Sequence, residues 1–185
     1  MWEDIPLPGL NIPSQTCKPA TRMALKKIVT DPSLEVTPSA EKSFWKNVVK
    51  SPSCWFWVGA ISSPDGYGRI TWQVNGRQRT LSAHRFAMLL SGYRLDTGTV
   101  CEHHCNEPLC VRVDDDHVFP STQSANISYA VELGRHRGNK RAVDIEQNFR
   151  VDRSRRIRDA LKKGWDSDRF FEAINDVGPR SYKLF

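Results

Sequence analysis

The fold is decided by VCEHHCNEPLCVRVDDDHVFPSTQSAN, residues 100–126, a stretch with more Cys, His and Asp side chains than core packing explains. Cys105, Cys110 and His117 have the spacing C-x4-C-x6-H. Two thiolates and one imidazole are three of the four ligands that tetrahedral zinc prefers. A small loop with little apolar content needs a crosslink to hold its shape, and a bound metal contributes folding free energy directly. The stretch therefore predicts a loop held by a structural zinc ion.

The five cysteines of the chain indicate the same chemistry. Their number is odd, and three of them lie within ten residues beside several histidines. In a chain without a signal peptide, such a cluster is more typical of a metal site than of disulfides. The fourth zinc ligand has to come from elsewhere. We expect Cys54, because it opens a predicted strand that can lie beside the loop, and Cys101 and Cys17 are the alternatives.

His103 and Asn126 form a second candidate site within the same stretch. The pattern predicts a short strand over residues 118–121 and a helix over residues 123–133, with Asn126 near the start of that helix. A first strand, the metal loop, a second strand and a helix together make a ββα unit. In such a unit His103 on the first strand and Asn126 on the helix can face each other across a cleft.

The chain before this stretch predicts an antiparallel sheet and two helices. Three segments rich in aromatic and β-branched residues predict strands, namely residues 54–60, 67–74 and 77–82. Asn75-Gly76 between the last two is a strong signal for a two-residue hairpin. Apolar residues at helical spacing predict helices over residues 39–50 and 83–91. The expected fold class is α+β.

Composition divides the chain into four parts. A Pro-rich N-terminal arm, with one short helix around residues 22–28, precedes the metal-binding domain, and a basic linker joins that domain to two helices over residues 153–163 and 167–175. The apolar side of these helices fits either a homodimer contact or packing on the preceding domain. The predicted parts are residues 1–38, 39–134, 135–152 and 153–185.

Positive charge is concentrated in the last third of the chain. The net charge is +6 and the pI about 9.2, which favours a polyanionic partner such as DNA. Residues 135–163 contain eleven Lys or Arg and four Asp or Glu, so this segment alone is +7. It is either a solvated helical face or a footprint for phosphates. The candidate phosphate contacts are Arg135, Arg137, Lys140, Arg141, Arg155 and Arg156.

The sequence gives no sign of a membrane segment. No apolar run approaches the roughly 20 residues that span a bilayer, and the N-terminus MWEDIPLPGL lacks the basic start and apolar centre of a signal peptide. We therefore expect a soluble, cytoplasmic protein.

The order of motifs from residue 54 to residue 126 resembles the zinc-containing HNH endonucleases common in bacteriophage genomes, and its core is similar to that of the His-Cys box homing endonucleases. Seven ordered elements are more specific than any single one. The elements that carry the resemblance are Cys54-Trp55-Phe56-Trp57, Tyr67-Gly68-Arg69, Ala83-His84-Arg85, His103-His104-Cys105, Cys110, His117 and Asn126.

The resemblance implies a His-Me finger (ββα-metal) nuclease that cuts double-stranded DNA and leaves 5′-phosphate and 3′-hydroxyl ends. It implies that His103 is the general base and that Asn126 helps to hold a single Mg²⁺ or Mn²⁺. Arg69 and Arg85 are candidate phosphate clamps. The zinc, saturated by protein ligands, is then purely structural.

Three departures from the family pattern leave alternatives open. Glu102 stands where many HNH enzymes have a metal-binding Asp, and residues 112–116 are longer and more acidic than the usual Asn-Pro connection. His103 is followed by His104, which becomes the base if the strand shifts by one residue. We favour His103, because the family spacing is His-x-Cys. The rival functions are a catalytically inactive zinc-stabilised DNA-binding module and a structural protein that uses zinc only to fold.

Overall fold

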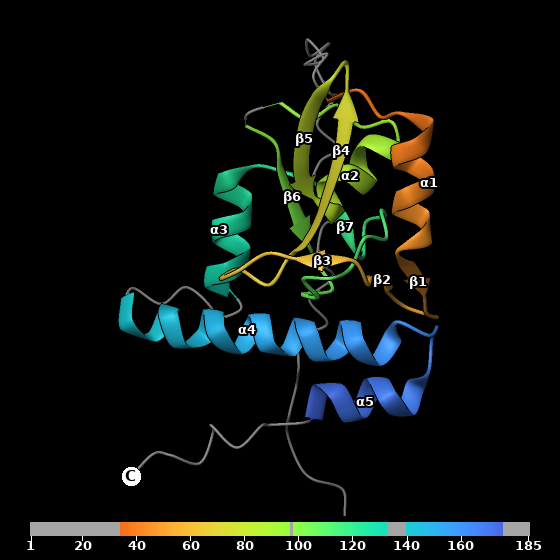
Figure 1. Cartoon of the computed structure of the whole chain (residues 1–185). Coiled ribbons are helices and arrows are strands. Elements are labelled where there is room, and N and C mark those ends of the chain that lie inside the picture. The colour runs from red at the N-terminus through yellow and green to blue at the C-terminus, as the bar shows by residue number, and fades with distance from the viewer. Residues whose placement is uncertain (1–33, 97, 133–139, 176–185) are drawn as a thin grey trace, which may run out of the picture.

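The computed structural model describes the backbone of residues 34–96, 98–132 and 140–175, and the side chains of these residues except 140–148. Within these ranges the fold combines five helices with three small antiparallel sheets, and the predicted α+β class is confirmed. A long β-hairpin stands in the centre, helices flank it, and two helices lie side by side across one end (Figure 1). The predicted helix around residues 22–28 lies outside the described residues.

Helix α1 (Pro38–Lys46) begins where proline and a capping threonine favour a helix start. The side chain of Thr37 accepts a hydrogen bond from the Ala40 amide, and Pro38 occupies the first helical turn, where its missing N–H costs nothing. The helix ends at Lys46, short of the predicted residue 50. The next residues form strand β1 (Val48–Lys50), which pairs with β2 (Trp55–Trp57).

The central sheet contains β3 (Ala60–Ile61), β4 (Gly68–Val74) and β5 (Arg77–Ser82). Asn75 and Gly76 have φ angles of 49° and 74°, as a two-residue primed turn requires, so the predicted hairpin is confirmed. One prediction was wrong: the segment 54–60 was expected to be one strand of this sheet. The segment is divided instead. Its part in β2 pairs with β1, and only its last residue, Ala60 in β3, pairs with β4.

The two larger of three hydrophobic clusters among the described residues hold most of these elements together. The first lies between α1, the central sheet and helix α2 (Ala83–Leu90), where the aromatic rings of Phe44, Trp57, Trp72 and Phe86 pack together. The second lies beneath β2 and contains Phe56 together with residues of the metal loop and of the C-terminal helices. Both cores are aromatic-rich, which suits a small domain because aromatic side chains bury the most area per residue.

The stretch that decides the fold forms strand β6 (Val100–His103), the metal loop (residues 104–117), strand β7 (Val118–Ser121) and helix α3 (Gln123–Glu132). β6 and β7 pair antiparallel, with His103 opposite Val118. Helix α2 packs against this hairpin, and α3 lies beside β6 (Figure 1). The β7 strand has the predicted bounds, and the start of α3 is as predicted.

The C-terminal part forms helices α4 (Lys140–Leu161) and α5 (Ser167–Asn175), which pack against each other below the sheets (Figure 1). The predicted boundary between a linker and a helix after residue 152 was wrong, since it falls inside α4. The apolar side of the hairpin packs back on the domain, where Ile157 and Leu161 are fully buried. None of the described helices is both long enough and apolar enough to cross a membrane.

Candidate metal centre and imidazole cluster

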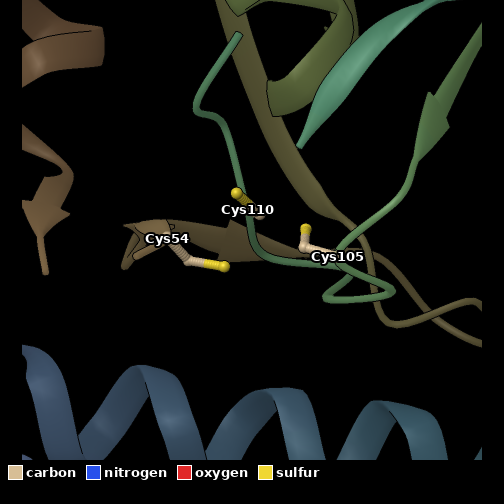
Figure 2. A group of neighbouring side chains, drawn as sticks. All are labelled: Cys54, Cys105 and Cys110. Carbon is tan, nitrogen blue, oxygen red and sulfur yellow. The ribbon is translucent and has the colours of Figure 1, made fainter. Parts of the chain in front are cut away.

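Three cysteines come together where the metal loop runs past β2. The Sγ atoms of Cys54, Cys105 and Cys110 all lie within 4.8 Å of one another, and Figure 2 shows the three side chains converging above helix α4. Backbone pairing brings them there: the Trp57 amide donates to the Leu109 carbonyl and the Val111 amide to the Trp55 carbonyl, each at 2.8 Å. The loop thus adds to the edge of β2 and carries Cys110 toward Cys54.

The three thiols fit a zinc ion in chemistry and in spacing. Sulfur ligands of a tetrahedral zinc lie about 3.8 Å apart. Hydrogen bonds from Cys110 and Cys54 lower the pKa of Cys105 to about 2. Hydrogen bonding with Cys105 in turn raises the pKa of Cys54 to about 12 and raises that of Cys110 as well. One thiol of the cluster therefore loses its proton readily, whereas the other two keep theirs. All three can be thiolates together only when a cation lies between them.

Among the described residues, the ligand atoms of this group are those of the three cysteines alone. The structure does not bring His117 into it, contrary to the predicted ligand set. The His117 ring is buried and its Nδ1–H donates to Asp114 Oδ1 at 2.7 Å, while Arg112 holds the same carboxylate. The prediction of Cys54 agrees with the observed cluster.

Neither alternative to Cys54 lies in the thiol cluster. Cys101 packs with Met88 and Val118 in a separate apolar group, and burial raises its pKa to about 11, which keeps it a neutral thiol. Cys17 lies outside the described residues.

His103 lies at the end of β6, with its ring directed toward the metal loop and α2. Its Nε2–H donates to the carbonyl oxygen of Cys110 at 3.1 Å, which leaves Nδ1 with the free lone pair. The ring centroid lies 4.7 Å from that of His84 and 5.8 Å from that of Tyr67. Burial lowers the pKa of His103, although the Cys110 carbonyl opposes this shift. The imidazole is therefore neutral near physiological pH.

His104 has different neighbours. It is exposed, its Nδ1–H donates to the Asp115 carbonyl at 2.9 Å, and its ring packs between those of Phe119 and Tyr129. The two consecutive histidines thus contact opposite sides of the hairpin, as period-2 alternation predicts. His103 contacts the side of the metal loop and α2, and His104 contacts the side of α3.

Asn126 and Glu102 stand on the two elements that the ββα pattern requires. Asn126 lies in the first turn of α3, where its backbone N–H donates to the Thr122 carbonyl at 3.0 Å, and its side chain is half-buried. Glu102 is 5% exposed and precedes His103 on β6, opposite Phe119 of β7. Helix α3 packs beside β6, on the side of the hairpin that His104 contacts, whereas His103 contacts the side of α2.

His84 lies against His103, although the sequence singled it out only as part of the Ala-His-Arg motif. It is 8% exposed, and within the described part of the chain its Nδ1 atom is buried without a hydrogen-bond partner. Burial lowers its pKa well below the usual value, and the neighbouring His103, Arg85 and Arg69 lower it further. The positive charges of Arg85 and Arg69 therefore disfavour a protonated His84. The Ala-His-Arg motif was the available signal.

The predicted phosphate contacts differ in how freely their side chains can reach DNA. Arg69 forms a loose ion pair with Asp65 at 3.6 Å, and Arg85 donates to the Thr99 carbonyl at 2.7 Å. Arg155 is exposed, whereas Arg156 donates to the Ala173 carbonyl and ties α4 to α5. The remaining predicted contacts lie outside the described residues or side chains: Arg135, Arg137, Lys140 and Arg141.

Comparisons with protein-family models, with characterised proteins and with solved structures found no match.

Proposed function

We propose that the protein is a metal-dependent DNA endonuclease of the HNH (His-Me finger) type. The observation that supports this most strongly is the order strand, metal loop, strand and helix, with His103 at the end of the first strand and hydrogen-bonded to the loop. This order is the one expected of a ββα-metal core. The reaction is hydrolysis of phosphodiester bonds in double-stranded DNA, with 5′-phosphate and 3′-hydroxyl ends.

His103 acts as the general base in this proposal. A base needs a neutral imidazole held in one orientation, with a lone pair free to accept a proton from water. The hydrogen bond from Nε2 to the Cys110 carbonyl fixes the ring and leaves Nδ1 free. Contacts with His84 and Tyr67 restrict the ring further. His104 is the alternative base, since its ring is also anchored to a carbonyl and lies on the α3 side.

Asn126 and Glu102 would hold a Mg²⁺ or Mn²⁺ ion through side-chain oxygens. Apart from the thiol cluster, the described residues bring no three His, Cys, Asp or Glu ligand atoms together. Mg²⁺ needs no such group, because proteins usually hold it with one or two oxygens while waters and substrate phosphates complete the shell. When bound, the ion offsets negative charge on the leaving oxygen.

A structural zinc ion would be held by Cys54, Cys105 and Cys110. His117, the fourth ligand that the sequence predicted, lies outside the thiol cluster, with its ring hydrogen-bonded to Asp114. Zinc at this position would fix the loop whose carbonyl orients His103.

Arg69 and Arg85 would bind the phosphates that flank the cut. The positive charge of both acts on His84, and guanidinium groups suit an anionic phosphate backbone. Arg155, Lys162 and Lys163 are the described basic residues of the segment 135–163 that are exposed, and they would extend the DNA contact.

The proposal is tested by incubating supercoiled plasmid with the purified protein and Mg²⁺, Mn²⁺ or EDTA. We expect nicked or linear DNA that requires the divalent ion and disappears with His103→Ala, while His104→Ala, the matched control, retains cleavage. Loss of activity in His104→Ala alone would move the base by one residue. A zinc-bearing protein that retards DNA without cutting it would support the alternative function, a zinc-stabilised DNA-binding module.

A further inference from the structure

The metal loop is covered by the C-terminal helices. Glu107 and Leu109 lie between the two loop cysteines, and Leu109 is buried in one core with Ile157 and Leu161 of α4. Cys110 is fully buried in the same core. Figure 2 shows α4 running directly beneath the three thiols. A metal ion held there would be separated from solvent on this side by α4.

One ion pair joins the loop to α4. Arg153 donates from a guanidinium nitrogen to Glu107 Oε2 at 2.8 Å, and the other oxygen, Oε1, accepts from the Leu109 amide at 3.3 Å. The Glu107 side chain is 7% exposed and that of Arg153 36% exposed. A buried carboxylate that loses its partner is strongly unfavourable. The Glu107 carbonyl also accepts from the Cys110 amide at 2.9 Å, so the pair fixes the turn that carries a candidate ligand.

Arg153 also balances negative charge beside the thiol cluster. Three thiolates and Zn²⁺ carry a net charge of −1, and the adjacent Glu107 carboxylate adds another. Arg153 is the cation that the described structure pairs with Glu107. Without it, two negative centres would face each other in a poorly solvated environment.

Aromatic contacts hold the rest of the α4–α5 helical hairpin against β2. Phe56 of β2 stacks on Trp165, with ring centroids 5.9 Å apart, and contacts Phe170 of α5 at 5.1 Å. Arg156 links α4 to the Ala173 carbonyl of α5. These contacts join the two helices to each other and to β2.

We infer that the α4–α5 hairpin retains the metal ion of the thiol cluster, and that Arg153 is the positioning residue that locks it over the loop through Glu107. Because coupling between two binding events is reciprocal, metal binding also stabilises the docked hairpin by the same factor. The inference rests on metal binding by the three cysteines and not on nuclease activity, so a protein that binds zinc without cutting DNA leaves it intact.

The first test measures zinc release from the full chain into a chromogenic chelator. Arg153→Met should release zinc at least about tenfold faster than the unmodified protein, because it leaves the Glu107 carboxylate buried and unpaired. Arg155→Met, on the exposed side of the same helix, is the matched control and should release zinc at the original rate. Arg153→Lys should restore much of the retention, and so should Glu107→Gln combined with Arg153→Met.

Release from Arg153→Met at the original rate, with helix content retained in circular dichroism, would overturn the inference. A second measurement covers a variant that fails to fold. In the unmodified protein, chelation of zinc should speed amide hydrogen exchange in residues 150–161 and in α5 while leaving α2 and β4 protected. Equal exchange with and without zinc would overturn the inference, as would a purified protein that binds no zinc.

Discussion

The Nε2 atom of His103 lies 3.1 Å from the carbonyl oxygen of Cys110, so the candidate base and a candidate metal ligand share one hydrogen bond. Cys110 is held by the thiol cluster on one side and by pairing with β2 on the other. The orientation of the imidazole therefore depends on a loop whose shape a metal ion would fix.

Replacing Cys105 should remove the metal and loosen the loop. We expect Cys105→Ser to lose bound zinc and to lower the unfolding temperature, because two thiolates retain the ion poorly and the loop has little other cohesion. Metal analysis of the purified protein and thermal unfolding measure both effects. Cys101→Ala is the control, since Cys101 lies in a different apolar group. Equal loss of zinc from both variants would contradict the assignment.

Replacing Asn126 should change the dependence on the catalytic ion. Under the proposed function, Asn126→Ala raises the Mg²⁺ concentration needed for half-maximal cleavage and lowers the rate, because an oxygen ligand is lost. Titrating Mg²⁺ in the plasmid assay measures both. Ser128→Ala, at an exposed position of the same helix, should leave the titration unchanged. An Asn126→Ala titration that overlays the original one would remove Asn126 from the metal site.

The sequence correctly predicted those elements that are determined by residues adjacent in the chain. The Asn75-Gly76 turn requires positive φ at both residues, and β5 and α5 have their predicted bounds. The helix predicted to reach residue 50 ends earlier because Val48–Lys50 gains a partner strand in β2. Pairing with a distant segment outweighed the local helical pattern, and no local pattern records such a partner.

The candidate site likewise has features with a local cause, which the sequence predicted, and features that depend on long-range packing. The spacing of Cys105 and Cys110 indicated a metal, since ligand chemistry is written in residue types. The pair of Glu107 and Arg153 joins residues 46 positions apart and depends on how α4 docks, so the sequence predicted a basic segment but not this ion pair. His84 was visible in a motif, but its unpartnered nitrogen is a property of packing.

Gly68, the centre of the Tyr-Gly-Arg motif, should not tolerate a side chain. A Cβ atom at this position would clash with Trp57 Cδ1 and would lie 3.0 Å from the Ala83 Cβ. We expect Gly68→Ala to lower the free energy of unfolding by about 1–3 kcal/mol through overpacking of the first core. Gly98→Ala is the control, because its nearest neighbour would be an Asp96 oxygen at 3.6 Å. Chemical denaturation of both variants measures the difference, and equal stabilities would contradict the packing argument.

His84 should make the fold sensitive to mild acid. Burial, together with His103, Arg85 and Arg69, lowers the pKa of His84 well below its usual value. Below about pH 6.5 the unfolded chain therefore binds a proton that the folded chain does not. Stability contributed by the neutral ring is present above that pH and falls as the pH drops. At pH 5.5 the loss amounts to about 1 kcal/mol.

Replacing His84 by phenylalanine keeps a ring in the same position and removes this proton. We expect the free energy of unfolding of His84→Phe to fall less between pH 7.5 and pH 5.5 than that of the unmodified protein. His103 and the metal-binding thiols titrate in both proteins, so the difference between the two slopes isolates His84. Denaturant titrations at the two pH values give these slopes. Parallel slopes would mean that the His84 ring is protonated in the folded protein, which its position beside two guanidinium groups opposes.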